Sequence, residues 1–304
     1  MRHWFEYLAV RALVGMVGMT PSALVVPCGR ALGLAWYTVN RSRRRIADAN
    51  LAAAFPSRSA SERRAIARSA FGHFIAQAFE TLKFSTLTPA QMLARVEVDG
   101  GDRVRFAYGQ KKGVLFITGH FGFWELHAIA HPLLFEPIGL LARALDNSRM
   151  NTLLERIRQC TGNAVIYRQG SIRRVMRMLQ DDHGIAVLID QHIHGPDAVY
   201  VEFFERRAAT VSAVAALALR TGSPVVPVFA LPLGKGRYRL IYEHPIEPPP
   251  QAEEGGADVT IREFTQRCTD VLEMYVRRHP DLWLWMHRRW RDDGPSDEGA
   301  HFLP

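Results

Sequence analysis

A histidine and a glutamate five residues apart form the part of the sequence best suited to chemistry. His120 follows an apolar run that ends at Thr118, and Glu125 comes shortly after it. A carboxylate that contacts an imidazole fixes its tautomer and stabilises its protonated form, so that the second ring nitrogen can act as a general base. The spacing alone also fits a structural histidine beside a solvent-facing glutamate.

Contact between the two side chains depends on the elements that carry them. Residues 113–118 predict a buried strand, and residues 121–134 predict the helix that follows. On a single helix, positions five residues apart differ in direction by about 140°. The pair can therefore meet only if His120 precedes the helix and folds back over its start, where free N–H groups could also stabilise an oxyanion.

The other segments predict an α/β fold. Further strands are expected at residues 138–142, 164–167, 185–189, 224–230 and 238–242, and helices at residues 62–84, 148–161, 171–183, 208–221 and 259–278. Apolar strands that alternate with helices are typical of a mixed, largely parallel sheet flanked by helices on both faces. Sites in such sheets lie where strands end and helices begin.

The positive charge of the chain is concentrated near its N-terminus. Residues 1–70 contain eleven arginines and three acidic residues, so their net charge of +8 accounts for the net charge of the whole chain, which is also +8. Residues 12–29 are uncharged, Trp36 and Tyr37 follow, and residues 41–45 contain four arginines. Apolar surface with aromatic ends and an arginine cluster is typical of a membrane-interface segment.

Three questions about this segment stay open. Pro21 interrupts a single straight helix, so the pattern does not decide whether the segment spans a membrane or lies flat on it. Helices packed into the core would also explain the apolar residues. Contact with nucleic acid is the least favoured reading, because no recognised DNA- or RNA-binding motif accompanies the charge.

Composition limits the class of protein. With 48% hydrophobic and 22% charged residues among 304, the chain is not disordered, collagen-like or a polytopic membrane protein. Three scattered cysteines without a CxxC pair argue against a disulfide framework or a zinc ribbon. We expect a helical membrane-attachment segment over residues 1–45, one α/β domain over 46–291 and a mobile tail over 292–304.

Five motifs in a fixed order carry a family resemblance. Residues 119–126 read GHFGFWEL. The others are Asn50-Leu51 with Phe55-Pro56, the LIDQ of residues 188–191, Phe203-Phe204 with Ala208-Ala209-Thr210, and the PDLWLWMHRRW of residues 280–290. Together they resemble the lipid A biosynthesis (lauroyl/myristoyl) acyltransferases, which belong to the His-x4-Asp/Glu lysophospholipid-acyltransferase-like superfamily.

The resemblance implies transfer of a fatty acyl chain at the cytoplasmic face of the cell inner membrane. The donor would be a thioester of acyl carrier protein or coenzyme A, and the acceptor a hydroxyl of an anionic membrane glycolipid, in particular a lipid A precursor. His120 would be the general base and Glu125 its charge-relay carboxylate. The resemblance implies no covalent acyl-enzyme, no metal and no cofactor.

Four further residues are expected to bind substrate. Arg158 and Asp190 match functional positions of the family, and Arg143 is placed like a family arginine. Guanidinium groups bind phosphate bidentately, which suits an anionic acceptor. Asp190, beside Gln191 at a strand end, is expected to orient groups around His120. Replacing His120 or Glu125 with alanine is expected to abolish transfer with little loss of stability.

Departures from the family pattern leave alternatives. Residues 190–195 read DQHIHG, where many lipid A members have DQD followed by an aromatic residue and glycine. The acceptor could therefore be a phosphatidylinositol-mannoside-type glycolipid, another glycolipid or a lysolipid. Asp190, His192 and His194 also suggest a zinc-dependent lipid hydrolase, although His127 and His131 lack the glutamate of HExxH. A non-catalytic membrane scaffold is a third reading, and the tryptophans of residues 282–290 are expected to pack in the core.

Overall fold

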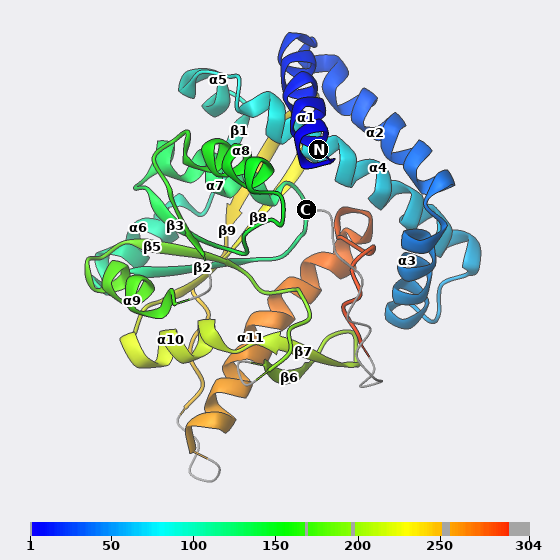
Figure 1. Ribbon diagram of the computed structural model, residues 1–304. Coiled ribbons are helices and arrows are strands. Elements are labelled where there is room, and N and C mark those ends of the chain that lie inside the picture. The colour runs from blue at the N-terminus through cyan, green and yellow to red at the C-terminus, as the bar shows by residue number, and fades with distance from the viewer. Residues whose placement is uncertain (1, 168–169, 196–197, 251–255, 292–304) are drawn as a thin grey trace.

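The computed structural model describes residues 2–167, 170–195, 198–250 and 256–291 (Figure 1). The tail expected over residues 292–304 lies outside these ranges. The structural statements below concern the described residues.

A seven-stranded sheet lies at the centre of the described chain, in the order β1-β9-β8-β2-β5-β3-β4. Its strands are β1 (Val96–Asp99), β2 (Val114–Thr118), β3 (Ile138–Ala142), β4 (Ala164–Tyr167), β5 (Gly184–Leu188), β8 (Val225–Gly234) and β9 (Arg237–Tyr242). Neighbouring strands pair in parallel except β8 and β9, which pair antiparallel. The largely parallel sheet expected from the sequence is confirmed.

Helices cover both faces of the sheet (Figure 1). They are α5 (Pro89–Leu93), α6 (Gly101–Gly109), α7 (Trp124–Leu134), α8 (Ser148–Gln159), α9 (Ile172–Gln180), α10 (Ala213–Thr221) and α11 (Gly256–Arg278), with a 3-10 turn η1 (Pro280–Leu282). Alternate residues of a strand point to opposite faces. Accordingly, Val114 and Phe116 of β2 lie in one buried apolar cluster, and Leu115 and Ile117 lie in the other.

The helix expected over residues 208–221 begins later than the sequence predicts. Residues 208–211 were expected to be helical, but they belong to β7 (Arg207–Val211), which forms a separate hairpin with β6 (Ala198–Glu202). The buried Arg289 donates hydrogen bonds to the Ala209 carbonyl and to the Thr210 hydroxyl at 2.5 Å, which anchors β7 to the C-terminal residues. The helix α10 starts only after this hairpin.

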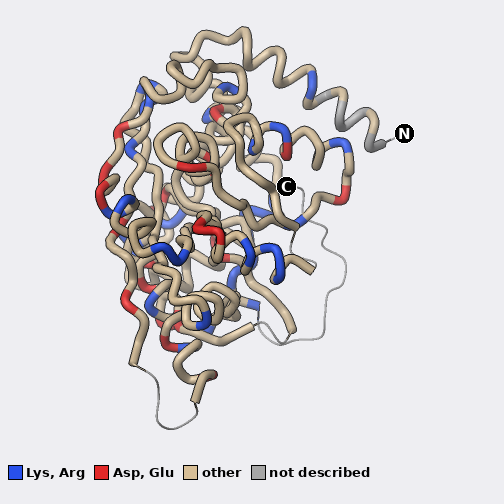
Figure 2. The backbone as a smooth tube through the Cα atoms, turned by 90° about the vertical axis from the view of Figure 1, so that its left-hand side faces the viewer, with Lys and Arg blue, Asp and Glu red and all other residues tan. Residues whose placement is uncertain are grey.

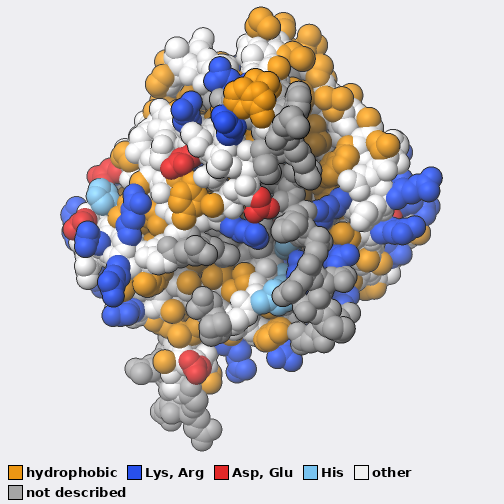
Figure 3. Space-filling model, viewed as in Figure 1, with side chains coloured by type: hydrophobic (Ala, Val, Ile, Leu, Met, Phe, Trp, Pro, Cys, Tyr) orange, Lys and Arg blue, Asp and Glu red, His pale blue; other side chains and the backbone are white. Residues whose placement is uncertain are grey.

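Four further helices come before α5 and β1 in the sequence: α1 (Arg2–Met19), α2 (Ser22–Val39), α3 (Arg41–Ala54) and α4 (Ala60–Phe84). The helix α2 packs closely on α4, because a Cβ at Gly33 would lie 2.3 Å from the Phe71 carbonyl oxygen. Its outer side is apolar and exposed, and Arg30 is its one charged residue (Figures 2 and 3). No helix in the described part of the chain has both the length and the apolar character needed to cross a membrane.

The turn between β2 and α7, residues 119–123, is called the His120 loop here. Gly122 has a φ of +57°, and a Cβ at this position would lie 2.0 Å from the Ala230 carbonyl oxygen. Phe123 donates its backbone N–H to the same carbonyl at 2.9 Å. Close contact with β8 therefore makes α7 begin at Trp124, three residues later than the sequence predicts.

We expect Gly122→Ala to destabilise the fold by about 2 kcal/mol or more, because the new methyl group meets both a left-handed backbone and a fixed carbonyl. Urea denaturation measures the loss. Gly109→Ala is the matched control, since nothing lies within 4 Å of a Cβ there. Equal midpoints for the two variants would contradict the expectation.

Candidate active site

The carboxylate that contacts the His120 imidazole belongs to a residue far away in the sequence, at the end of another strand. His120 lies after β2, and Asp190 follows the neighbouring strand β5. The His120 Nδ1 atom lies 2.8 Å from Asp190 Oδ1, and the His120 backbone N–H donates to Asp190 Oδ2 at 2.7 Å. The Asp190 side chain is 3% exposed and that of His120 is 17% exposed. The pair is thus largely buried, with the imidazole nearer the solvent.

Asp190 determines which imidazole nitrogen carries the proton. Burial opposes its ionisation, but the His120 charge and hydrogen bonds from His120 and Trp283 outweigh burial and lower the pKa of Asp190 to about 2. An ionised carboxylate only accepts hydrogen bonds, so the His120 Nδ1 atom must donate. In the neutral ring, the lone pair therefore lies on Nε2, which can accept a proton.

Glu125 does not occupy the place expected of it. It lies in the first turn of α7, buried, and accepts two hydrogen bonds from Arg158 of α8: Nε to Oε2 at 3.0 Å and Nη2 to Oε1 at 2.5 Å. Burial alone would raise the pKa of Glu125, yet Arg158 and then His120 lower it. The expectation that Glu125 holds the imidazole is corrected, because the geometry gives that contact to Asp190.

The other expected substrate-binding residues lie at the same sheet edge. The Gln191 Nε2 atom is 3.3 Å from His120 Nε2, so its amide can donate to the free lone pair. Arg143 directly follows β3 and is exposed. The structure therefore brings His120, Asp190 and Gln191 into contact and Glu125 and Arg158 into a second pair, while Arg143 lies on the surface beyond β3.

The C-terminal residues 282–289, called the C-terminal strap here, cover the His120 loop. Gly122 donates its backbone N–H to the Leu282 carbonyl at 2.9 Å, and Leu284 donates to the His120 carbonyl at 3.1 Å. Trp283 is buried, as expected, but it also donates its indole N–H to Asp190 Oδ2 at 2.8 Å. Sequence reasoning treated this tryptophan as core packing only.

Comparison with known proteins gives the family. The family described as "Bacterial lipid A biosynthesis acyltransferase" matches residues 1–292. The chain belongs to this family. It is 26% identical over 295 residues to the lipid A biosynthesis lauroyltransferase of Escherichia coli K12, covering 95% of this chain and 92% of that one. It is 24% identical over 297 residues to the lipid A biosynthesis myristoyltransferase of the same strain, covering 97% and 90%.

The protein is thus an O-acyltransferase of the lipid A late acyltransferase type, which confirms the resemblance found in the sequence. Among solved structures, the 1-acyl-sn-glycerophosphate acyltransferase PlsC of Thermotoga maritima is similar over 82% of this chain and 97% of that one. The sequence identity is 14% and the TM-score is 0.35.

The four histidines considered for a zinc site lie in two separate places in the acyltransferase. His192 and His194 contact each other at 3.4 Å beyond β5, and His127 and His131 lie buried on α7. The His131 Nδ1 atom lies 2.8 Å from the Tyr242 hydroxyl. Among the described residues, no group of three or more histidines, cysteines or acidic residues is placed to hold a metal ion.

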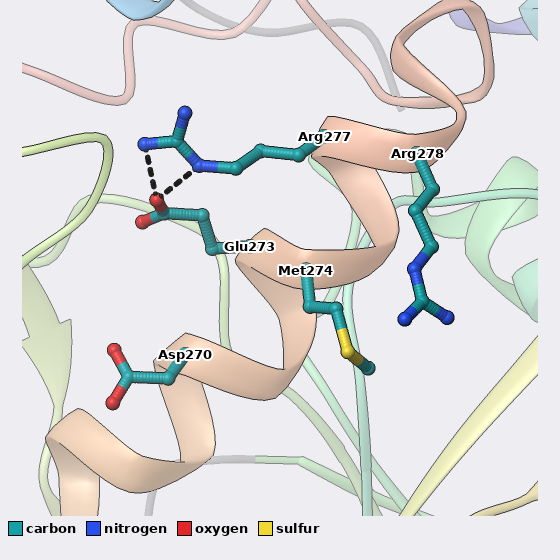
Figure 4. Close-up of a pocket in the computed structure, with 5 residues that line it drawn as sticks. All are labelled: Asp270, Glu273, Met274, Arg277 and Arg278. Atoms are coloured by element: carbon teal, nitrogen blue, oxygen red, sulfur yellow. Dashed lines mark hydrogen bonds and ion pairs between the residues drawn. The ribbon is translucent and has the colours of Figure 1, made fainter.

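A surface hollow of about 340 Å³ lies on α11, away from these residues. Figure 4 shows that one helix supplies its lining, which consists of Asp270, Glu273, Met274, Arg277 and Arg278. Glu273 and Arg277 form an ion pair at 2.7 Å. The hollow contains none of the expected site residues, and we assign no chemistry to it.

The buried histidines predict acid sensitivity for the acyltransferase. Burial lowers the pKa of His127 and of His287 to about 3, and that of His131 well below its usual value. The unfolded chain binds these protons below about pH 6.5, so stability falls as the pH decreases from there toward 3. The expected slope is about 1.4 kcal/mol per pH unit for each histidine.

Urea denaturation between pH 7 and 5 measures this slope. His127→Phe should reduce this slope by about 1.4 kcal/mol per pH unit, the contribution of one proton. Phenylalanine suits the site because His127 lies among aromatic rings, with Phe116 at 5.1 Å between centroids. His244→Gln, on an exposed residue, is the control. An unchanged slope in His127→Phe would show that His127 already takes up its proton in the folded state.

Proposed function

We propose that this acyltransferase moves a fatty acyl chain from a thioester of acyl carrier protein or coenzyme A to a hydroxyl of a lipid A precursor. The arrangement of His120 supports the proposal most directly. Asp190 holds Nδ1, and Nε2 faces the Gln191 amide at the exposed side of the ring. The relatives named as lipid A lauroyl- and myristoyltransferases support the choice of acceptor.

In the proposed mechanism, His120 is the general base. Its Nε2 atom removes the proton from the acceptor hydroxyl while the oxygen attacks the thioester carbonyl. Asp190 stabilises the imidazolium that forms. The tetrahedral intermediate then collapses, the C–S bond breaks, and the thiolate takes the proton from Nε2 as it leaves. Proton transfer of this kind contributes about 10²–10⁴-fold, and the reaction requires neither a covalent acyl-enzyme nor a metal or cofactor.

The second ionic pair is proposed to bind the negative charge of the substrate. Glu125 occupies Nε and Nη2 of Arg158, so Nη1 is left to approach an anionic oxygen. Because the His120 charge also lowers the pKa of Glu125, the two ionic pairs lie close enough to interact. Arg143, exposed at the end of β3, is proposed to contact the anionic headgroup of the acceptor.

We also propose that α1 and α2 attach the enzyme to the cytoplasmic face of the inner membrane. Large apolar side chains are exposed along both helices: Trp4, Leu8, Met16, Met19, Leu24, Leu32, Leu34 and Val39. Exposed apolar surface of this extent beside an arginine cluster supports helices that lie flat in the interface. The arginines of residues 41–45 follow directly and would contact anionic headgroups.

Removal of residues 1–45 would not test this attachment cleanly, because α2 packs on α4. We expect instead that Met19→Ser/Leu24→Ser/Leu32→Ser weakens binding to anionic phospholipid vesicles by at least about tenfold, since each inserted side chain contributes about 1.5–3 kcal/mol. The three residues are 84%, 52% and 53% exposed. Co-sedimentation measures binding, and Phe106→Ser/Ile172→Ser, at exposed apolar residues of α6 and α9, is the control. Equal loss in the control, or none in either, would contradict attachment through α1 and α2.

Mass spectrometry of reaction products tests the function itself. The purified full chain is incubated with a lipid A precursor and with acyl-carrier-protein or coenzyme A thioesters in parallel. We expect the precursor to gain the mass of one ester-linked acyl chain. Acylation of a lysophospholipid in the same assay, without modification of the lipid A precursor, would overturn the proposed acceptor and leave acyl transfer intact.

A further inference from the structure

We infer that Trp283 is a positioning residue of the active site, which holds the Asp190 carboxylate in the orientation that receives His120. The inference rests on the proposed role of His120 as base and of Asp190 as its partner. It concerns a residue that acts through Asp190, and it gives the tryptophan of the C-terminal strap a function beyond core packing.

Both oxygens of Asp190 receive directed donors. Oδ1 accepts from His120 Nδ1 at 2.8 Å, and Oδ2 accepts from the His120 backbone N–H at 2.7 Å and from Trp283 Nε1 at 2.8 Å. A carboxylate can turn about its Cβ–Cγ bond, and the indole donor opposes that rotation by holding Oδ2. The indole N–H thus keeps Oδ1 directed at the base.

Trp283 is itself held in register with the loop it supports. Its backbone forms an isolated antiparallel bridge with Phe121, the residue after His120. Its ring packs against Trp285 at 4.6 Å and Phe203 at 5.4 Å between centroids. The donor, the carboxylate and the histidine backbone therefore belong to one rigid unit, whose parts come from three distant places in the sequence.

The backbone of Gly119 also lies close to the Asp190 carboxylate and limits its movement. A Cβ at Gly119 would lie 3.0 Å from Asp190 Oδ2 and 2.9 Å from the Leu272 side chain. The carboxylate is thus bounded by the His120 loop on one side and by the indole on another. With its side chain 3% exposed, it has little access to water that could replace a lost donor.

The C-terminal strap contains a control for Trp283. Trp285 is also fully buried and also donates one indole hydrogen bond, but to the Pro280 carbonyl at 2.5 Å. Phenylalanine at either position removes one indole N–H and part of a ring from the same segment. A purely structural role predicts similar effects of the two substitutions, whereas a positioning role predicts an effect on turnover from Trp283 alone.

We expect Trp283→Phe to lower kcat by about 10- to 100-fold with unchanged KM values for donor and acceptor, because small displacements of a base have effects of this size. Trp285→Phe should keep kcat within about twofold, whatever it does to the melting temperature. The downfield proton resonance of the His120 Nδ1–H group should shift in Trp283→Phe and not in Trp285→Phe. Benzothienylalanine at position 283, which keeps the indole shape without the N–H, serves if Trp283→Phe does not fold.

A double-mutant cycle separates this inference from the proposed function. In an Asp190→Asn background, Trp283→Phe should cause little further loss of kcat, because the partner through which it acts is already changed. Equal kcat for Trp283→Phe and Trp285→Phe, with inactive His120→Ala, would overturn the positioning role and leave the proposed base intact. Full activity in His120→Ala would overturn both.

Discussion

Asparagine in place of Asp190 is expected to lower the kcat of acyl transfer by about 10³–10⁴-fold, the size of effect seen when an imidazole is held in the wrong tautomer. The amide can present its NH₂ group to His120 Nδ1, which then moves the ring proton to Nε2 and removes the lone pair that acts as base. The neutral amide also stabilises the imidazolium less. We expect His120→Ala to be at least as severe, and the double variant to be no worse than the single ones.

Steady-state kinetics with purified, folded enzyme measure this loss. Asp270→Asn, at an exposed aspartate of α11, is the matched control and should retain activity. Comparable kcat values for Asp190→Asn and the parent protein would show that Asp190 has a structural role only. Active Asp190→Asn together with inactive Glu125→Gln would return the charge-relay role to Glu125.

The second large effect concerns stability. Glu125→Gln leaves the Arg158 guanidinium, whose side chain is 20% exposed, without its ionic partner. Breaking one side of a buried ion pair destabilises by about 3–5 kcal/mol, so we expect a loss near the lower end of that range for this partly exposed pair. The lowered pKa of Glu125 gives the sign of the pH dependence. The pair stabilises the fold above the usual carboxyl range and ceases to do so as the pH falls through the lowered pKa, so the parent and the variant converge in acid.

Urea denaturation at pH 7 measures the loss of stability, and a series of denaturation curves from pH 5 to below pH 4 measures the convergence in acid. Glu125→Gln/Arg158→Met removes both charges and should recover much of the lost stability, which distinguishes an unpaired charge from a general packing defect. A Glu125→Gln variant as stable as the parent would mean that Arg158 finds another partner or water. It would also restore the sequence-based expectation that Glu125 can be replaced with little loss of stability.

The elements around the site could be predicted because their signals are local. The bounds of β3 and β4 agree with the expected ranges, since continuous apolar runs between polar turns determine them. The partner of His120 could not be assigned in the same way. Glu125 is near in sequence, but the parallel register of β2 and β5 brings Asp190 to the imidazole instead.

Other errors have the same long-range cause. Residues 208–211 have helical spacing, yet the pairing with β6 and the hydrogen bonds from Arg289 make them a strand. The sequence correctly predicts that the tryptophans of the C-terminal strap are buried, but it does not predict which groups their indole N–H atoms bind. The Trp283 indole N–H binds the Asp190 carboxylate, which lies almost a hundred residues earlier, and hydrophobic periodicity does not predict a contact over that separation.

The C-terminal strap also relates activity to the order in which the ribosome makes the chain. The residues of the strap pair with the His120 loop. Asn50 of α3 donates to the Trp285 and His287 carbonyls at 2.8 and 2.7 Å, so the packing of α3 also depends on the strap. The apolar helices α1 and α2 precede the strap in the sequence and are therefore synthesised before it. A nascent or prematurely terminated chain that lacks residue 283 would therefore have the apolar helices α1 and α2 but an incomplete acyl-transfer centre, and we expect turnover only once the strap has been synthesised and has paired with the His120 loop.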